Sequence, residues 1–397
     1  MRTKELINWG SYDVDNFGDL LFPFLVEHFL GREYSDILHV SPTGTPSIWP
    51  DAKQSLTIIE ALGRVSQPEL IVGGGNLINT SASSSINYVE KPAFAKIVHE
   101  SFAWVPYVLL ANYGIPYAYN CIGVAKSIPP AKRQLIRCAL EAASFISCRD
   151  EASLSHLRLA GVRSPIVVAP DSAVDVARVF PIEAMRVHYA TEVRLKYALP
   201  SDGTTAVIHV KERYLKDDFP AFVMVLELLC ASGVHPILVP LGMCHRDDRV
   251  LTEPRLRDLR VTCIQKPERI LDILSMLAVS RYYLGSSLHG AITALAYGNG
   301  IAIVADEEAS RLKKFSGFLS HVSLGHCLFD SWKDACASLA VAGMDICETM
   351  SDATARAMAT RPDPWEAIIR GFRTERPALR LTVDVDLART AREHYLI

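Results

Sequence analysis

A histidine stands near the start of an alanine-rich segment that reads SSLHGAITALAYGNGIAIV, from Ser286 to Val304. We expect a strand before this segment, a serine that caps a helix, and a second strand after Gly298–Gly300. His289 then lies in the first turn of the helix, where the positive end of the helix dipole favours a neutral imidazole and attracts phosphate. A neutral imidazole beside a phosphoester can exchange protons at neutral pH, although a lone histidine here could equally be a capping or core residue.

Polar residues and glycines follow several of the strands expected in the first half of the chain. Ligands of open parallel sheets bind beyond the carboxyl ends of the strands, so a site is expected among these loops. Arg149 comes directly after an apolar run, and its planar fork suits phosphate or carboxylate, although a surface ion pair would also explain it. Turn and capping roles, with Asp19 as a cap, equally explain the residues after the first strand. The candidates of the first half are Asn16, Gly18, Asp19, Gly73, Gly74, Gly75, Asn76, Arg149, Asp171 and Ser172.

The glycine triplet Gly73–Gly75 follows the apolar run Leu70–Val72. Glycine lets the main chain approach a ligand closely or adopt a positive φ, and the N–H groups of such a loop can form a nest for an anion. Neither the P-loop pattern nor the G-x-G-x-x-G pattern is present, which weakens an interpretation as a nucleoside triphosphate or dinucleotide site.

The second half of the chain carries further cationic candidates. Lys211 and Arg213 follow the run 206–210, and strand alternation would place them on one face, although a solvated edge explains them as well. The segment 245–248 contains histidine and aspartate, but no third histidine stands at ligand spacing, so we expect no metal. The candidate binding residues of this half are Lys211, Arg213, Ser286, Ser287, Leu288, Lys313 and Lys314, with His289 as the catalytic candidate.

Short apolar runs alternate with helical patterns through most of the chain, which is typical of parallel α/β sheets. The expected strands are 6–9, 70–72, 117–122, 145–148 and 166–168 in the first half, and 206–210, 236–240, 261–264, 281–284 and 301–304 in the second. The charged segment 179–201 suits a connector better than a core. We therefore predict an α/β fold with two Rossmann-like domains, 1–180 and 181–345, that face each other across a cleft. A tail, 346–397, follows with helical patterns at 352–359 and 364–372 and a strand at 379–385, and we expect it to pack back on the first domain.

Length and composition exclude several classes of protein. The chain has 397 residues, of which 49% are hydrophobic and 21% charged, as is ordinary for a soluble protein of two domains. The net charge of -3 and the lack of a basic run argue against a nucleic-acid partner. Nine scattered cysteines without a C-x-x-C pair favour a reducing compartment over a disulfide framework or a zinc site. The start lacks the pattern of a signal peptide, and prolines interrupt the most apolar window, 102–124, so we expect a cytoplasmic protein without a transmembrane segment.

Five segments, taken together, resemble the polysaccharide pyruvyl transferase family in order and spacing, from about residue 7 to residue 320. They are Asn16–Asp19 (NFGD), Ile71–Leu77 (IVGGGNL), Ile146–Asp150 (ISCRD) with Ser153 and Leu154, Pro170–Ser172 (PDS) and Ser286–Ala291 (SSLHGA). The resemblance implies a two-domain fold of the glycosyltransferase GT-B type. It also implies transfer of the pyruvyl unit of phosphoenolpyruvate to two hydroxyls of a sugar, which forms a cyclic ketal and releases phosphate, with no cofactor besides the donor. His289 would be the catalytic acid/base and Arg149 an anion ligand.

The chain departs from this family at a position close to the histidine. Many members carry arginine two residues before it, where this chain has Ser287, so one anion contact must come from elsewhere, with Lys211, Arg213, Lys313 and Lys314 as candidates. Two alternatives stay open: a nucleotide-sugar-dependent glycosyltransferase of GT-B type, and a non-catalytic relative that binds sugar or phosphate. The sequence also leaves open which sugar is the acceptor, whether it is lipid-linked, whether the protein associates peripherally with the inner face of a membrane, and whether it forms a homo-oligomer.

Overall fold

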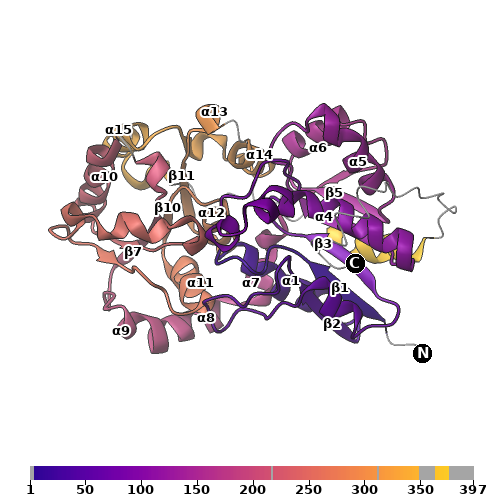
Figure 1. Cartoon of the computed structure of the whole chain (residues 1–397). Helices are drawn as coiled ribbons and strands as arrows, with labels where there is room; N and C mark the ends of the chain where they lie inside the picture. The colour runs from indigo at the N-terminus through magenta and orange to yellow at the C-terminus, as the bar shows by residue number, and fades with distance from the viewer. Residues whose placement is uncertain (1–3, 216–217, 311–312, 348–362, 375–397) are drawn as a thin grey trace.

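Two parallel six-stranded sheets covered by helices form the two lobes of the molecule (Figure 1). The computed structural model describes residues 4–215, 218–310, 313–347 and 363–374. The first sheet has the order β2-β1-β3-β4-β5-β6 and the second the order β12-β11-β10-β7-β8-β9. The order of winding changes between β1 and β3 in one sheet and between β7 and β10 in the other. Such switch points are where open sheets bind ligands, so both lobes present a binding edge.

The ten strands that the sequence predicted for the two sheets are present, with small shifts of the bounds, and two further strands lie at sheet edges. The first sheet consists of β1 (Glu5–Trp9), β2 (Asp36–Val40), β3 (Glu69–Gly73), β4 (Tyr117–Ile122), β5 (Phe145–Cys148) and β6 (Val167–Val168). The second consists of β7 (Thr204–His209), β8 (Val234–Leu238), β9 (Thr262–Cys263), β10 (Tyr282–Gly285), β11 (Gly300–Val304) and β12 (Leu328–Phe329). The sequence missed β2, which mixes polar with apolar residues, and β12, which has only two residues.

Helices pack on both faces of the sheets and in the segment that joins them. Those of the first lobe are α1 (Phe22–Leu30), α2 (Ile58–Leu62), α3 (Ile86–Val89), α4 (Pro92–Tyr113), α5 (Pro130–Glu141), α6 (Glu151–Leu159) and α7 (Val176–Val179). Those of the second are α10 (Phe219–Ala231), α11 (Ile270–Val279), α12 (Leu288–Ala296), α13 (Glu307–Ser310), α14 (Lys314–His321) and α15 (Trp332–Ala342). The described part of the chain contains no helix with both the length and the apolar character needed to cross a membrane.

The segment between the lobes, which the sequence predicted to be a connector, is helical. It forms α8 (Ile182–His188), a π-helical turn and α9 (Arg194–Lys196), and it packs against α11 of the second lobe (Figure 1). Met185 and Val193 of this segment are buried in the main hydrophobic core, which continues from the helices of the first lobe into α11 and α12. The lobes therefore share apolar packing as well as a cleft. The predicted domain boundaries remain predictions.

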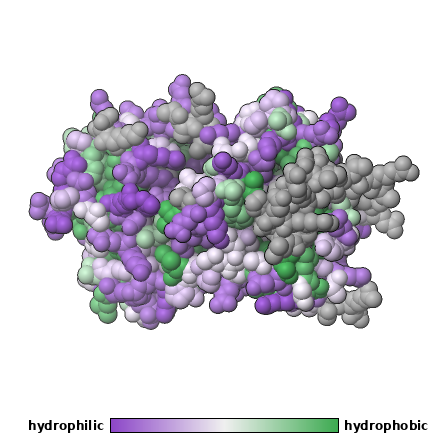
Figure 2. Space-filling model, in the orientation of Figure 1, coloured by the Kyte–Doolittle hydropathy of each residue, from purple (hydrophilic) through white to green (hydrophobic). Residues whose placement is uncertain are grey.

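The last described helix, α17 (Pro364–Arg373), lies against β4 and β5 of the first sheet. Its Trp365 stacks on Phe29 of α1 with ring centroids 5.0 Å apart. The helical pattern expected at 352–359 and the strand at 379–385 lie outside the described residues. On the face shown in Figure 2, the described surface is mostly hydrophilic, with hydrophobic residues in separate spots.

Candidate active site

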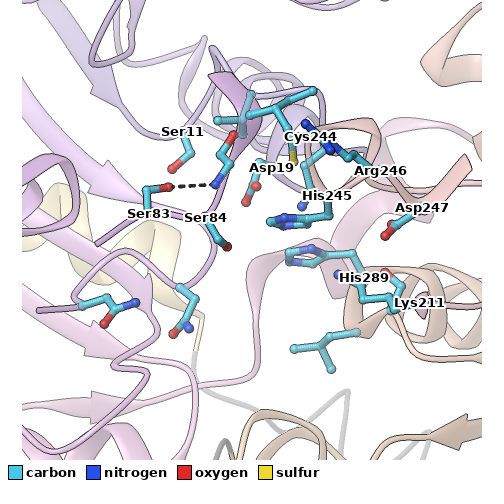
Figure 3. Close-up of a pocket in the computed structure, with 18 of the residues that line it drawn as sticks. Ser11, Asp19, Ser83, Ser84, Lys211, Cys244, His245, Arg246, Asp247 and His289 are labelled. Carbon is cyan, nitrogen blue, oxygen red and sulfur yellow. Dashed lines mark hydrogen bonds between the residues drawn. The ribbon is translucent and has the colours of Figure 1, made fainter. Parts of the chain in front are cut away.

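A cavity of about 590 Å³ lies between the lobes, at the switch points of both sheets (Figure 3). Its walls come from loops that follow β1, β3 and β5 in the first lobe and β7, β8, β10 and β11 in the second. Main-chain contacts close the two lobes on each other beside it: the Phe17 N–H donates to the Leu241 carbonyl at 2.8 Å, and Asn16 pairs with Gly242. The cavity is therefore assembled from both lobes at once.

His289 lies in the first turn of α12, as the sequence predicted, and reaches across to the first lobe. Ser287 caps the helix, because its hydroxyl oxygen accepts a hydrogen bond from the Gly290 N–H. The imidazole packs edge-on against Phe22 and lies so close to Gly18 that a Cβ on this glycine would be 1.8 Å from Nδ1. Its Nε2 is 3.5 Å from a carboxylate oxygen of Asp171 and has no hydrogen-bond partner among the described groups. Glycine at position 18 thus leaves the space that the imidazole occupies.

Asp171 joins the histidine to Arg149. The same carboxylate oxygen that faces His289 lies 3.4 Å from Arg149 Nη1, and Arg149 Nε is 3.5 Å from Asp150. Burial opposes ionisation of Asp171, but its contacts with His289 and Arg149 prevail and hold its pKa below the usual value. Asp171 is thus an ionised carboxylate that holds a guanidinium and an imidazole together. The helix-dipole argument had left out this negative charge beside His289.

Asp19 is the other carboxylate near the histidine. It begins the short 3-10 turn Asp19–Leu21 after β1, and it caps neither this turn nor α1, contrary to the capping role considered from the sequence. Burial and the neighbouring Asp171 raise its pKa to about 6, although His289, Arg149 and Lys314 act in the opposite direction. Asp19 can therefore change its protonation state close to neutral pH.

Cationic side chains from the second lobe face this group. Lys211 and Arg213 follow β7, Arg246 follows β8, and Lys314 begins α14; all line the cavity together with Arg149. Burial lowers the pKa of Lys314 well below its usual value, and the positive charges of Lys211, Arg149 and Arg213 lower it further. The cations repel one another in this arrangement, so an anion placed among them would be stabilised.

The remaining part of the cavity is lined by neutral polar groups of the first lobe. Hydroxyls and amides dominate it, and Figure 3 shows Ser11, Ser83 and Ser84 on this side, away from Lys211 and Asp247. Behind it, the Tyr88 hydroxyl donates to Asp13 at 2.6 Å, which fixes the wall to the end of β1. The residues of this wall are Ser11, Asn76, Asn79, Ser83, Ser84, Ser85, Tyr88 and His99.

The family model of polysaccharide pyruvyl transferases matches residues 16–298 of the chain. The chain belongs to the polysaccharide pyruvyl transferase family. The matched residues include parts of the loops that build the cavity, namely those after β1, β3, β5, β7 and β10. No curated protein matches the chain in sequence.

Solved structures with the same arrangement of lobes come from other enzymes. UDP-GlcNAc 2-epimerase from Neisseria meningitidis, bound to UDP-GlcNAc, is 12% identical with a TM-score of 0.56, and 93% of this chain and 99% of that chain are covered. The epimerase from Methanocaldococcus jannaschii is 13% identical with a TM-score of 0.54, and the match covers 94% of this chain and 99% of the epimerase chain. A variant of the wall teichoic acid polymerase TagF is 9% identical with a TM-score of 0.51, and the match covers 94% of this chain and 90% of the polymerase chain. At such identities the likeness concerns the fold, which is of GT-B type as the resemblance implied.

The structure brings most of the predicted site residues to the cavity, whereas eight of them do not line it. Asp171 and Ser172 lie behind it, and Ser286 accepts a hydrogen bond from the Lys211 N–H at 3.1 Å, which ties the ends of β7 and β10 together. Lys313 is exposed outside it. The predicted residues that line the cavity are Asn16, Asp19, Asn76, Arg149, Lys211, Arg213, Ser287, Leu288, His289 and Lys314; those that do not are Gly18, Gly73, Gly74, Gly75, Asp171, Ser172, Ser286 and Lys313.

The glycine triplet serves packing between two loops rather than the cavity wall. Gly74 and Gly75 both have φ of +83°, a conformation that side chains other than glycine rarely adopt. A Cβ on Gly74 would lie 2.1 Å from the Phe22 ring, and one on Gly75 would lie 2.7 Å from an Asp19 carboxylate oxygen. The triplet thus lets the loop after β3 press against Phe22 and Asp19, and it acts on the site through them.

Sequence reasoning missed the neutral wall apart from Asn76, and it considered the segment 245–248 after β8 only as a metal site. The run Ser81–Ser85 was a visible signal, because its serines follow the glycine triplet closely, but it reads equally well as a loop. His245 and Asp247 line the cavity, and the Asp247 carboxylate accepts from His209 Nε2 at 2.8 Å. Among the described residues, no group of three or more histidine, cysteine, aspartate or glutamate side chains is arranged to hold a metal ion.

Proposed function

We propose that this family member transfers the pyruvyl group of phosphoenolpyruvate to two hydroxyls of a sugar, with release of phosphate. The observation that carries the proposal is a cavity with two kinds of wall, into which His289 projects from the start of α12. Cations of both lobes suit the phosphate and carboxylate of the donor, whereas the serine and asparagine wall suits the hydroxyls of a sugar. His289 lines the cavity where the two walls meet.

The chemistry requires anion binding and proton transfer. Arg149, Lys211 and Lys314 hold the negative groups of the donor, and their mutual repulsion makes the empty cavity favour an anion. One sugar hydroxyl adds to C2 of the donor while C3 is protonated. Phosphate then leaves, and the second hydroxyl adds to the same carbon to close the ketal. His289 takes the proton of a hydroxyl and returns it to the leaving phosphate, and Asp171 stabilises the imidazolium between these steps.

Calorimetric titration with phosphoenolpyruvate tests the donor. We expect saturable binding by the wild type, and a loss of about 10-fold to 100-fold in affinity for Lys211→Met and for Lys314→Met, since each removes one charge-assisted contact. Lys333→Met is the matched control, because Lys333 is an exposed lysine of α15 outside the cavity. Equal losses in the control would show a general charge effect instead.

The same titration with UDP-sugars tests the second candidate function. The solved structures of this fold include an epimerase bound to UDP-GlcNAc, so a nucleotide-sugar enzyme is the main rival. Binding of a UDP-sugar without binding of phosphoenolpyruvate would overturn the proposal. Phosphate release from phosphoenolpyruvate in the presence of methyl hexopyranosides then separates turnover from mere binding. The donor is a metabolite of the cytoplasm, and we therefore propose that the protein acts there.

A further inference from the structure

The proposed reaction needs two groups that handle protons in opposite order. Two hydroxyls each lose a proton, C3 of the donor gains one, and the departing phosphate gains the other. In the first addition, one group must accept the proton of the hydroxyl while another delivers a proton to C3. A single imidazole cannot start the step both protonated and unprotonated, so a second group of comparable pKa is required beside it.

The carboxylates that line or adjoin the cavity differ in how far they are already bound, and Glu212 among them is an exposed residue. Asp171 is held by Arg149 and His289, and Asp247 accepts a hydrogen bond from His209. Asp19 lines the cavity, and no described side chain or main-chain group forms a hydrogen bond or ion pair with its carboxylate. It is set beside the histidine by the loop after β1, and Figure 3 shows both in the same part of the cavity. Asp19 is therefore free to contact a substrate.

We propose that Asp19 is a second catalytic residue, which gives a proton to C3 of the donor and later takes the proton of the second sugar hydroxyl. This inference rests on the proposed function. Asp19 begins as a carboxylic acid and His289 as a neutral imidazole that accepts the proton of the first hydroxyl. After the first addition the states are exchanged: His289 protonates the phosphate as its bond to C2 breaks, and the Asp19 carboxylate accepts the last proton. Both groups return to their initial states, and the protons balance.

The charges around Asp19 suit this role. Burial and Asp171 raise the pKa of Asp19 to about 6, whereas His289, Arg149 and Lys314 act in the opposite direction. Burial raises the pKa of Tyr12 and of Cys244, and the charge of Asp19 adds to both shifts. The bound donor would add negative charge to the cavity and raise the pKa of Asp19 further. Binding of the donor would therefore load Asp19 with the proton that the first addition consumes.

Proton uptake on donor binding tests the role of Asp19 without an acceptor. At pH 7 a carboxyl group of pKa about 6 is about one-tenth protonated, so full protonation in the complex would take up as much as about 0.9 proton. We would titrate phosphoenolpyruvate into the wild type and Asp19→Asn in two buffers of different ionisation enthalpy. Asp36→Asn is the control, since Asp36 is an exposed residue at the start of β2. The uptake should fall in Asp19→Asn and stay unchanged in the control; the same uptake in Asp19→Asn as in the wild type would overturn the inference.

Turnover gives the second readout. In Asp19→Asn we expect phosphate release in the presence of methyl hexopyranosides to fall by about 100-fold or more, with the donor bound as tightly as before or more tightly. The decline of the wild-type rate with rising pH should disappear in this variant, and added formate should restore part of the activity of Asp19→Ala. Normal turnover of Asp19→Asn would overturn the inference while leaving the proposed function intact. Failure of the wild type to bind phosphoenolpyruvate would instead overturn the proposed function, and with it the donor on which this inference depends.

Discussion

Gly18→Ala should remove most of the activity. The backbone at Gly18 has φ of -65° and ψ of -43°, which alanine adopts readily, so the substitution introduces no backbone strain. The new Cβ would, however, lie 1.8 Å from Nδ1 of His289, whereas an ordinary contact begins at 3.4 Å. The imidazole or the loop must therefore move by about 1.6 Å.

A shift of this size displaces His289 from Asp171 and from the donor. Misplacement of a reacting group by about 1 Å can cost about 100-fold in rate, so we expect kcat for phosphate release to fall by at least that factor. The melting temperature should fall as well, because the new Cβ would also lie 2.5 Å from the Cβ of His289, and overpacking of this kind costs about 1–3 kcal/mol. We would therefore measure kcat well below the melting transition.

Gly63→Ala provides the matched control. Gly63 is exposed at the end of α2, has φ of -71°, and a Cβ there would meet its nearest neighbour at 3.6 Å. This variant should keep full activity and gain slight stability, since alanine restricts the unfolded chain. A kcat of Gly18→Ala within about threefold of the wild type would refute the idea that His289 must stay where the structure places it.

Three further substitutions examine other parts of the structure. Asp171→Asn should lower kcat by about 100-fold in the phosphate-release assay, because a neutral amide cannot stabilise the imidazolium of His289; an unchanged kcat would contradict this role. Asp51→Ala should lower the unfolding free energy measured in urea by about 1 kcal/mol, because the Asp51 carboxylate accepts hydrogen bonds from the first two N–H groups of α11 at 2.9 Å. An unchanged unfolding free energy would show that water replaces the carboxylate at these N–H groups. Side-chain hydrogen bonds with His39 and Lys53 lower the pKa of Glu27 from an ordinary value of 4.5 to about 2. The resulting stability is present above pH 4.5 and is lost as the pH falls toward 2, so Glu27→Gln should lower the melting temperature at pH 7 and not at pH 2.

The sheets could be predicted because their strands are short, apolar and bounded by turns. The order of the strands within each sheet and the contacts that join the two lobes could not be predicted, since both depend on residues far apart in the chain. The carbonyl of Leu241 accepts from the Phe17 N–H, for example, and nothing in either segment alone indicates the other. The contribution of the connector to the core could not be predicted for a related reason, because Met185 and Val193 pack into a core that the segment itself does not reveal.

The position of the candidate site in the fold could be predicted from the sequence, whereas the contacts between its residues could not. His289 and Arg149 stand out because each follows a strand, where parallel sheets bind ligands. Gly18 looked like a turn residue, yet its lack of a side chain makes room for the imidazole. Asp171 looked like a substrate ligand, and the structure places its carboxylate behind the reacting groups, against Arg149 and His289. Such differences depend on distances of a few ångströms between separate loops, which spacing in the sequence does not encode.

The division of the site between two lobes limits when the molecule can react. Asp19, Arg149 and Asp171 belong to the first lobe, and His289 belongs to the second. Polar contacts such as that between Phe17 and Leu241, the hydrogen bond of His321 to the Arg149 carbonyl at 3.0 Å, and the apolar core that the two lobes share keep them together. If the lobes part to admit a bulky glycan, the imidazole separates from its carboxylates at the same moment. An enol phosphate held in the parted molecule would then meet water without a catalyst, and wasteful hydrolysis of the donor would be suppressed until the acceptor is enclosed.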